Sequence, residues 1–133
     1  MSDHKESPDN LLWYLQERAK ELSCLYKIEE VLNRPHAVLS DVCKVIIEAI
    51  PPGWQYPDVS VAKIEIGDEV YQSENFKETP WVLRTDIEVQ DKAVGEIRVY
   101  YTKEMPRADI GPFLQEEEKL LGTIADRIGH FIM

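Results

Sequence analysis

The stretch WVLRTDIEVQDKAVGEIRVYY, residues 81–101, carries the clearest structural pattern in the chain. Apolar and polar residues alternate along both arms, and the alternation breaks only at Gln90-Asp91-Lys92. A period of two is typical of antiparallel strands that turn one face to a core and the other to water. The expected core face contains Leu83, Thr85, Ile87, Val89, Gly95, Ile97, Val99 and Tyr101. The stretch therefore predicts a β-hairpin that is half buried under helices.

Three helices are predicted around this hairpin, two before it and one after it. The first runs over residues 10–33, and the second over about 35–49, where Pro51-Pro52-Gly53 ends it. The last follows Asp109, a candidate N-cap, with Pro112 in its first turn. All three carry apolar residues at spacings of three and four, which is the period of an amphipathic helix.

A second hairpin is predicted between the second helix and residue 81. Residues 59–66 are rich in β-branched side chains, Gly67-Asp68 supplies a tight turn, and residues 69–73 form the returning strand. The connection over residues 74–80 is too short for a crossover helix. Helices at both ends of two hairpins predict an α+β domain with an antiparallel sheet.

Composition limits the partners and the location that we expect. The chain has 133 residues and a net charge of -10, with 25 acidic and 15 scattered basic residues, so we expect no nucleic acid and no anionic membrane as a partner. It contains no apolar run long enough for a membrane helix and only two cysteines, Cys24 and Cys43, which predicts a cytoplasmic protein with reduced thiols. Residues 1–9 are expected to form a mobile tail, and residues 10–133 a single domain.

The usual signatures of catalysis are missing from the sequence. His4, His36 and His130 have no metal-ligand spacing, so no metal site is predicted. No serine occupies a nucleophile elbow and no glycines form a phosphate loop, so we expect no catalytic residues and no enzyme. The run Glu116-Glu117-Glu118 is interpreted as negative charge favoured by the dipole at a helix N-terminus.

Four local segments add a family resemblance that spans nearly the whole chain after residue 10. They are RAKELSCLY (18–26), IPPGWQYP (50–57), ENFKETPW (74–81) and GPFL (111–114). These segments resemble compact GAF-like sensor domains that precede bacterial or archaeal histidine kinases or belong to phosphoenolpyruvate-synthase-like proteins. The resemblance implies a profilin-like antiparallel sheet of about five strands with the N-terminal and C-terminal helices packed on one face, with a PAS-like fold as the alternative.

The same resemblance implies a non-catalytic regulatory domain for signal transduction, followed by a catalytic or transmitter domain in the full-length protein. The chain lacks the Asn-Lys-x-Asp pattern of cyclic-nucleotide-binding GAF domains, and neither cysteine is placed as in the bilin-attaching type. No ligand residue can therefore be transferred from those families, and no cofactor is expected.

Large aromatic residues in the connections suggest where a small ligand would bind. The pocket candidates are Trp54, Tyr56, Asn75, Phe76, Trp81 and Arg84. Aromatic walls with a few polar groups at the rim are typical of ligand pockets. The same aromatics could instead form a lid over the core, and the domain would then be a dimerisation or docking module without a ligand.

The first and last helices carry more apolar surface than one packing face needs, which predicts a parallel or near-parallel homodimer. In this interpretation Leu15, Leu22 and Tyr26 face the sheet. The dimer-interface candidates are Cys24, Ile28, Val31, Leu121 and Ile128. In a monomer, the tail or Trp13 would have to cover these side chains instead.

Overall fold

The computed structural model describes the backbone of residues 8–133 and the side chains from Asn10 onward. The described part contains three α-helices, four strands and one short 3-10 helix. The helices are α1 (Pro8–Leu32), α2 (Leu39–Gly53), α3 (Gln115–Ile132) and the 3-10 helix η2 (Pro57–Val59). The strands are β1 (Ser60–Ile66), β2 (Glu69–Gln72), β3 (Val82–Val89) and β4 (Lys92–Tyr101). A tail was predicted over residues 1–9. Residues 1–7 of it lie outside the described residues, and helix α1 already begins at Pro8.

The strands form one antiparallel sheet in the order β2-β1-β4-β3. The predicted hairpin of β3 and β4 is confirmed, and its turn consists of Gln90 and Asp91, which have φ angles of 52° and 67°. Two positive φ angles in succession are the mark of a turn whose twist matches that of the flanking strands. The first hairpin also turns at Gly67-Asp68 as expected. The α+β class is confirmed, and the sheet has four strands in the described residues where about five were expected.

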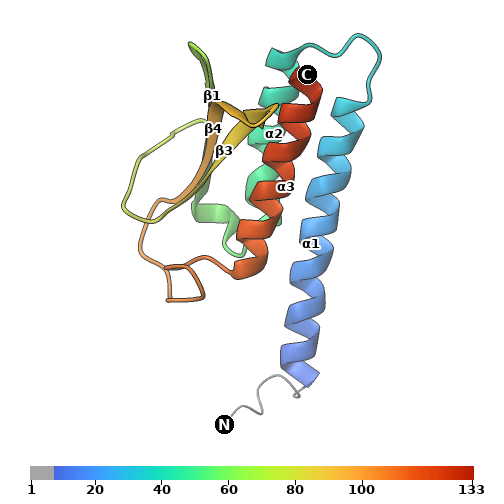
Figure 1. Ribbon diagram of the computed structural model, residues 1–133. Coiled ribbons are helices and arrows are strands. Elements are labelled where there is room, and N and C mark those ends of the chain that lie inside the picture. Colours follow the sequence, from blue (N-terminus) through green and yellow to red (C-terminus); the bar gives the residue numbers. More distant parts are fainter. Residues whose placement is uncertain (1–7) are drawn as a thin grey trace.

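Three layers make up the described part of the chain (Figure 1). The helices α2 and α3 cover one face of the sheet, and α1 packs on these two helices from the outside. The predicted contact of the first helix with the sheet is therefore wrong. The last helix packs on the sheet, chiefly on β3, as expected.

The core lies between the sheet and the two inner helices. On the strands its side chains come from alternate positions, among them Leu83, Ile87, Ile97, Val99 and Tyr101. The opposite face of the sheet is charged and bears a basic row beside an acidic row, which is what the period of two predicts. The basic row is Lys63, Arg98 and Arg84, and the acidic row is Glu65, Glu96 and Asp86.

Two helix boundaries differ from the prediction. Helix α2 starts at Leu39 because the preceding residues form a turn in which His36 has a φ of 62°, and it includes Pro51 and Pro52 in its last turn. Helix α3 starts at Gln115, after a tight turn in which Ile110 and Phe113 bond to each other. Pro112 and Asp109 thus precede the helix, but Asp109 Oδ2 still accepts a hydrogen bond of 2.9 Å from the backbone N–H of Gln115.

Two glycines of α3 allow a matched test of how closely this helix approaches the sheet. A Cβ atom at Gly129 would overlap the carbonyl oxygen of Glu88 in β3, whereas a Cβ atom at Gly122 would meet nothing within 4 Å. Gly129→Ala is therefore expected to lower the free energy of unfolding by about 2 kcal/mol, because α3 must move off the strand. Gly122→Ala is expected to raise it by up to about 1 kcal/mol through helix propensity. Urea denaturation followed by circular dichroism measures both, and equal effects would contradict the close approach.

Candidate functional site

The six predicted pocket residues do not surround a common cavity. Trp54 is fully buried in the core, and Tyr56 packs edge-on against Tyr101 at 5.6 Å between ring centroids. Phe76 lies on the other side of the sheet, edge-on to Tyr100 at 5.4 Å. The other three are Trp81, which is half buried, and Asn75 and Arg84, which are exposed.

Surface clefts of about 730, 670, 460 and 300 Å³ lie in the described part of the chain. None of the six pocket candidates lines any of these four clefts. The largest lies between α2 and the edge strand β2, and the second and third lie between α1 and α3. These clefts thus lie away from the six residues that the sequence suggested as a pocket.

A buried carboxylate joins the three helices at one end of the domain. Glu117 of α3 is only 1% exposed. Its Oε1 accepts a hydrogen bond of 2.8 Å from the backbone N–H of Leu114, and its Oε2 accepts one of 2.7 Å from the backbone N–H of Gln55. The first bond caps α3 and the second fixes the segment that follows α2. One side chain therefore ties α3 to the end of α2.

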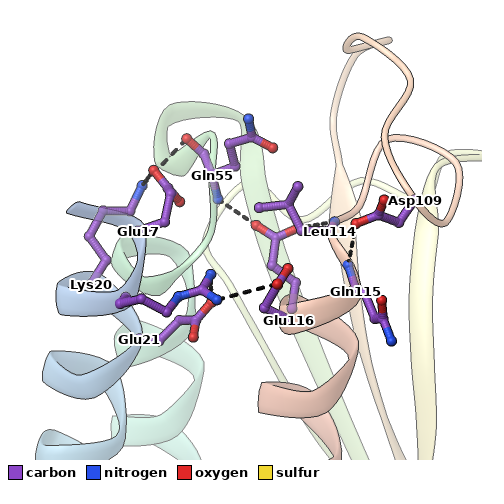
Figure 2. Close-up of polar contacts among 10 residues, drawn as sticks. Glu17, Lys20, Glu21, Gln55, Asp109, Leu114, Gln115 and Glu116 are labelled. Atoms are coloured by element: carbon purple, nitrogen blue, oxygen red, sulfur yellow. Dashed lines mark hydrogen bonds and ion pairs between the residues drawn. The ribbon is translucent and has the colours of Figure 1, made fainter. Parts of the chain in front are cut away.

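Helix α1 reaches the same place through Glu17, which is 6% exposed, and Lys20. The ammonium group of Lys20 lies 3.1 Å from Glu17 Oε2 and 3.5 Å from the carbonyl oxygen of Gln55 (Figure 2). We call Glu17, Lys20, Gln55, Leu114 and Glu117 the helix junction. Three of the four segments quoted in the sequence analysis, 18–26, 50–57 and 111–114, meet at or beside it, because they contain Lys20, Gln55 and Leu114.

Burial dominates the electrostatics of the helix junction. It raises the pKa of Glu117 to about 7, although its two backbone hydrogen bonds act in the opposite direction. The nearby carboxylates of Glu17 and Glu21 raise this pKa further. Burial also raises the pKa of Tyr101, and the charge of Glu117 adds to that effect. The junction therefore contains an acid that changes its charge near neutral pH.

The sequence contained a signal for Glu117 that its acidic neighbours concealed. Glu117 lies four residues after Phe113 and three before Leu120, so it occupies a position of the apolar stripe of α3. Its neighbours Glu116 and Glu118 are more exposed and fit the explanation by the helix dipole. A charged residue at a core position is the pattern that indicates a buried, hydrogen-bonded carboxylate.

The predicted orientation of α1 is reversed in the structure. Cys24, Ile28 and Val31 are buried, whereas Leu22 and Tyr26 are 68% and 71% exposed. The interface candidates Leu121 and Ile128 on α3 are buried as well. All five candidates thus belong to the core of the single chain and leave no surface there for a second one. Both sides of α1 have apolar residues at helical spacing, and helices α2 and α3 pack against the side that contains Cys24.

The reversal leaves an apolar stripe on the outside of α1. Leu12, Leu15, Ala19, Leu22 and Tyr26 are all exposed, and we call them the outer α1 face. They follow one another at spacings of three and four residues. Leu15 and Cys24 are nine residues apart, about two and a half turns, so this stripe lies opposite the buried one.

Two classes of feature are not found in the described residues 8–133. No helix there is long and apolar enough to cross a membrane. No three His, Cys, Asp or Glu side chains in the same range are grouped so that they could hold one metal ion. Cys24 and Cys43 are free and buried, and burial raises the pKa of both thiols to about 12.

Comparison of the chain with family models, curated proteins and solved structures gives no match.

Proposed function

We propose that this chain is a non-catalytic association domain that forms a homodimer through the outer α1 face. The supporting observation is the exposure of that face, whose four large side chains are 54% to 71% exposed. Apolar stripes of this length on a water-facing helix mark association surfaces in folded proteins.

The area available agrees with the need of a stable dimer. Leu11, Leu12, Leu15, Leu22 and Tyr26 are each open over more than half of their surface. If each side chain has roughly 200 Å², they offer on the order of 600 Å² of apolar surface. A standard interface takes roughly 800 Å² from each partner, of which about 65% is apolar in homodimers.

A second copy of the chain is the occupant that the pattern fits best. Spacings of three and four let side chains of one helix fill the gaps of an identical helix. None of the five residues of the outer α1 face is charged, although the chain carries a net charge of -10. Two copies can therefore meet there without bringing like charges into the centre of the contact.

Leu22→Glu is expected to weaken the dimer at least a hundredfold, because it buries a carboxylate at the centre of the interface. Sedimentation velocity over a range of protein concentrations measures the dissociation constant. Leu22 is 68% exposed in the single chain, so the fold itself should keep its stability. Gln72→Glu adds the same charge on the distant strand β2 and serves as the control. The proposal would be contradicted by a wild type that stays monomeric at concentrations on the order of 100 micromolar. It would also be contradicted by a Leu22→Glu variant that dimerises as well as wild type does.

The resemblance to GAF-like domains supports a regulatory role for this dimer. In that role the domain lies in the cytoplasm and transmits a signal to a transmitter domain or to a catalytic domain that uses phosphoenolpyruvate. A small ligand remains part of the proposal through the resemblance alone. Native mass spectrometry of the purified protein tests it, and a spectrum with only the mass of the polypeptide would count against a tightly held ligand.

A further inference from the structure

Resting on the homodimer proposed above, we infer that the two α1 helices pair in antiparallel orientation and cross near Ala19. Leu11 of each copy then enters the groove between α1 and α3 of the other copy. This arrangement differs from the parallel pairing expected from the sequence, which rested on the opposite side of α1.

The residues that flank the outer α1 face favour the antiparallel orientation. The flank on the α3 side consists of Leu11, Arg18 and Leu25, and the other flank consists of Gln16, Ser23 and Glu30. In a parallel pair with a two-fold axis, opposite flanks meet, so Leu11 would face Gln16 and Leu25 would face Glu30. In an antiparallel pair each flank meets its own copy, so Leu11 faces Leu25 twice.

The groove between α1 and α3 gives Leu11 a place in the second copy. It has a volume of about 460 Å³, and its apolar lining includes Leu22, Leu25 and Leu120. Leu11 and Leu25 lie seven residues to either side of Arg18, which is roughly 10 Å along the helix axis in each direction. A crossing near Ala19, the small residue of the outer α1 face, therefore brings Leu11 over the groove of the other copy.

Antiparallel pairing also brings the two Arg18 side chains toward each other. Each guanidinium group lies 2.7 Å from a carboxylate oxygen of Glu21 and 3.5 Å from one of Glu116. It also lies over the ring of Tyr14, with its Cζ 4.8 Å from the ring centroid. The charge of Arg18 is thus balanced within its own chain, and the two copies need not repel each other at this point.

Pulsed electron paramagnetic resonance on a spin-labelled Glu30→Cys variant distinguishes the two orientations. Glu30 is exposed near the end of α1, outside the outer α1 face. Antiparallel helices that cross at Ala19 separate the two labels by roughly 33 Å along the axis. Parallel helices bring them within about 20 Å, because packed helix axes are only 8–10 Å apart. Wild type treated with the same reagent is the control, since Cys24 and Cys43 are buried.

A pair of alanine variants tests the groove separately. Leu11→Ala is expected to weaken the dimer at least fivefold. Trp13 lies outside the outer α1 face and both of its flanks, and Trp13→Ala should change the dissociation constant less than twofold. A distance of less than about 20 Å between the two labels would contradict the antiparallel orientation but not the proposed dimer. An unchanged dissociation constant for Leu11→Ala overturns the contact with the groove. A wild type that forms no dimer overturns this inference together with the proposed function.

Discussion

Replacing Trp54 with alanine is expected to lower the free energy of unfolding by about 4 kcal/mol. The side chain is 0% exposed and is among the largest that the core encloses completely. Trp54 directly follows the last turn of α2, at the point where the chain leaves the helical layer. Removing the indole leaves a cavity that the surrounding helices and strands cannot close without moving.

Urea denaturation followed by circular dichroism measures this loss. Trp13→Ala is the matched control, because the indole of Trp13 is 40% exposed at the start of α1 and should contribute less than about 1 kcal/mol. Trp81→Ala should fall between the two, because Trp81 is half buried. The same loss for Trp13→Ala and Trp54→Ala would mean that Trp54 does not occupy the core.

The stability of the protein is expected to fall by about 3 kcal/mol between pH 4.5 and pH 8.5 through Glu117 alone. Its pKa rises from 4.5 to about 7 on folding because burial disfavours the charged form. The folded chain therefore binds this proton more tightly than the unfolded chain does. The stabilising contribution is fully present below pH 4.5 and is lost as the pH rises through 7.

Urea denaturation of wild type and Glu117→Gln at pH 5, 6, 7 and 8 isolates this contribution. The variant keeps the shape of the side chain and removes its titration, so its stability should fall less than that of wild type over this range. The measurement needs one fixed protein concentration, because a dimer adds stability by mass action. Glu118→Gln removes an exposed carboxylate next to it and should follow the wild-type curve. Parallel curves for Glu117→Gln and wild type would contradict a buried, titrating Glu117.

Charged groups near Glu117 add to the effect of burial. Glu17 and Glu21 of α1 oppose its ionisation, and Tyr101 of β4 lies close enough to feel its charge. Lys20 is paired with Glu17. Arg18 is paired with Glu21 and Glu116. Both basic side chains are therefore paired with carboxylates other than Glu117.

The sheet could be predicted from the sequence, whereas the side on which α1 is buried could not. Alternation along residues 81–101 allows only one face of β3 and β4 to be apolar, so the core positions follow directly. Helix α1 has two apolar stripes at helical spacing, one through Leu15 and Leu22 and one through Cys24 and Ile28. Local periodicity cannot choose between them, because the choice depends on where α2 and α3 lie.

The structure does not bring the six pocket candidates together, for a related reason. Trp54, Phe76 and Trp81 were grouped because they are aromatic and lie in connections, but the strands between them carry Trp54 and Phe76 to opposite faces of the sheet. Composition alone carries no information on which face a connection crosses. Glu117 could have been found, because its position in the stripe of α3 is visible in the sequence.

Helix α1 is anchored unevenly along its length, and this has a consequence for its dynamics. Its second half is fixed by Cys24, Ile28 and Val31, whereas every side chain from Leu11 to Gln16 is exposed. The six side chains of this segment are less covered than those of the second half, so its amide hydrogens should exchange more rapidly with solvent. Contact with a second chain would order this segment and slow that exchange, at a cost in conformational entropy that subtracts from the affinity. Binding of a second chain at the outer α1 face would then lengthen the stable part of helix α1.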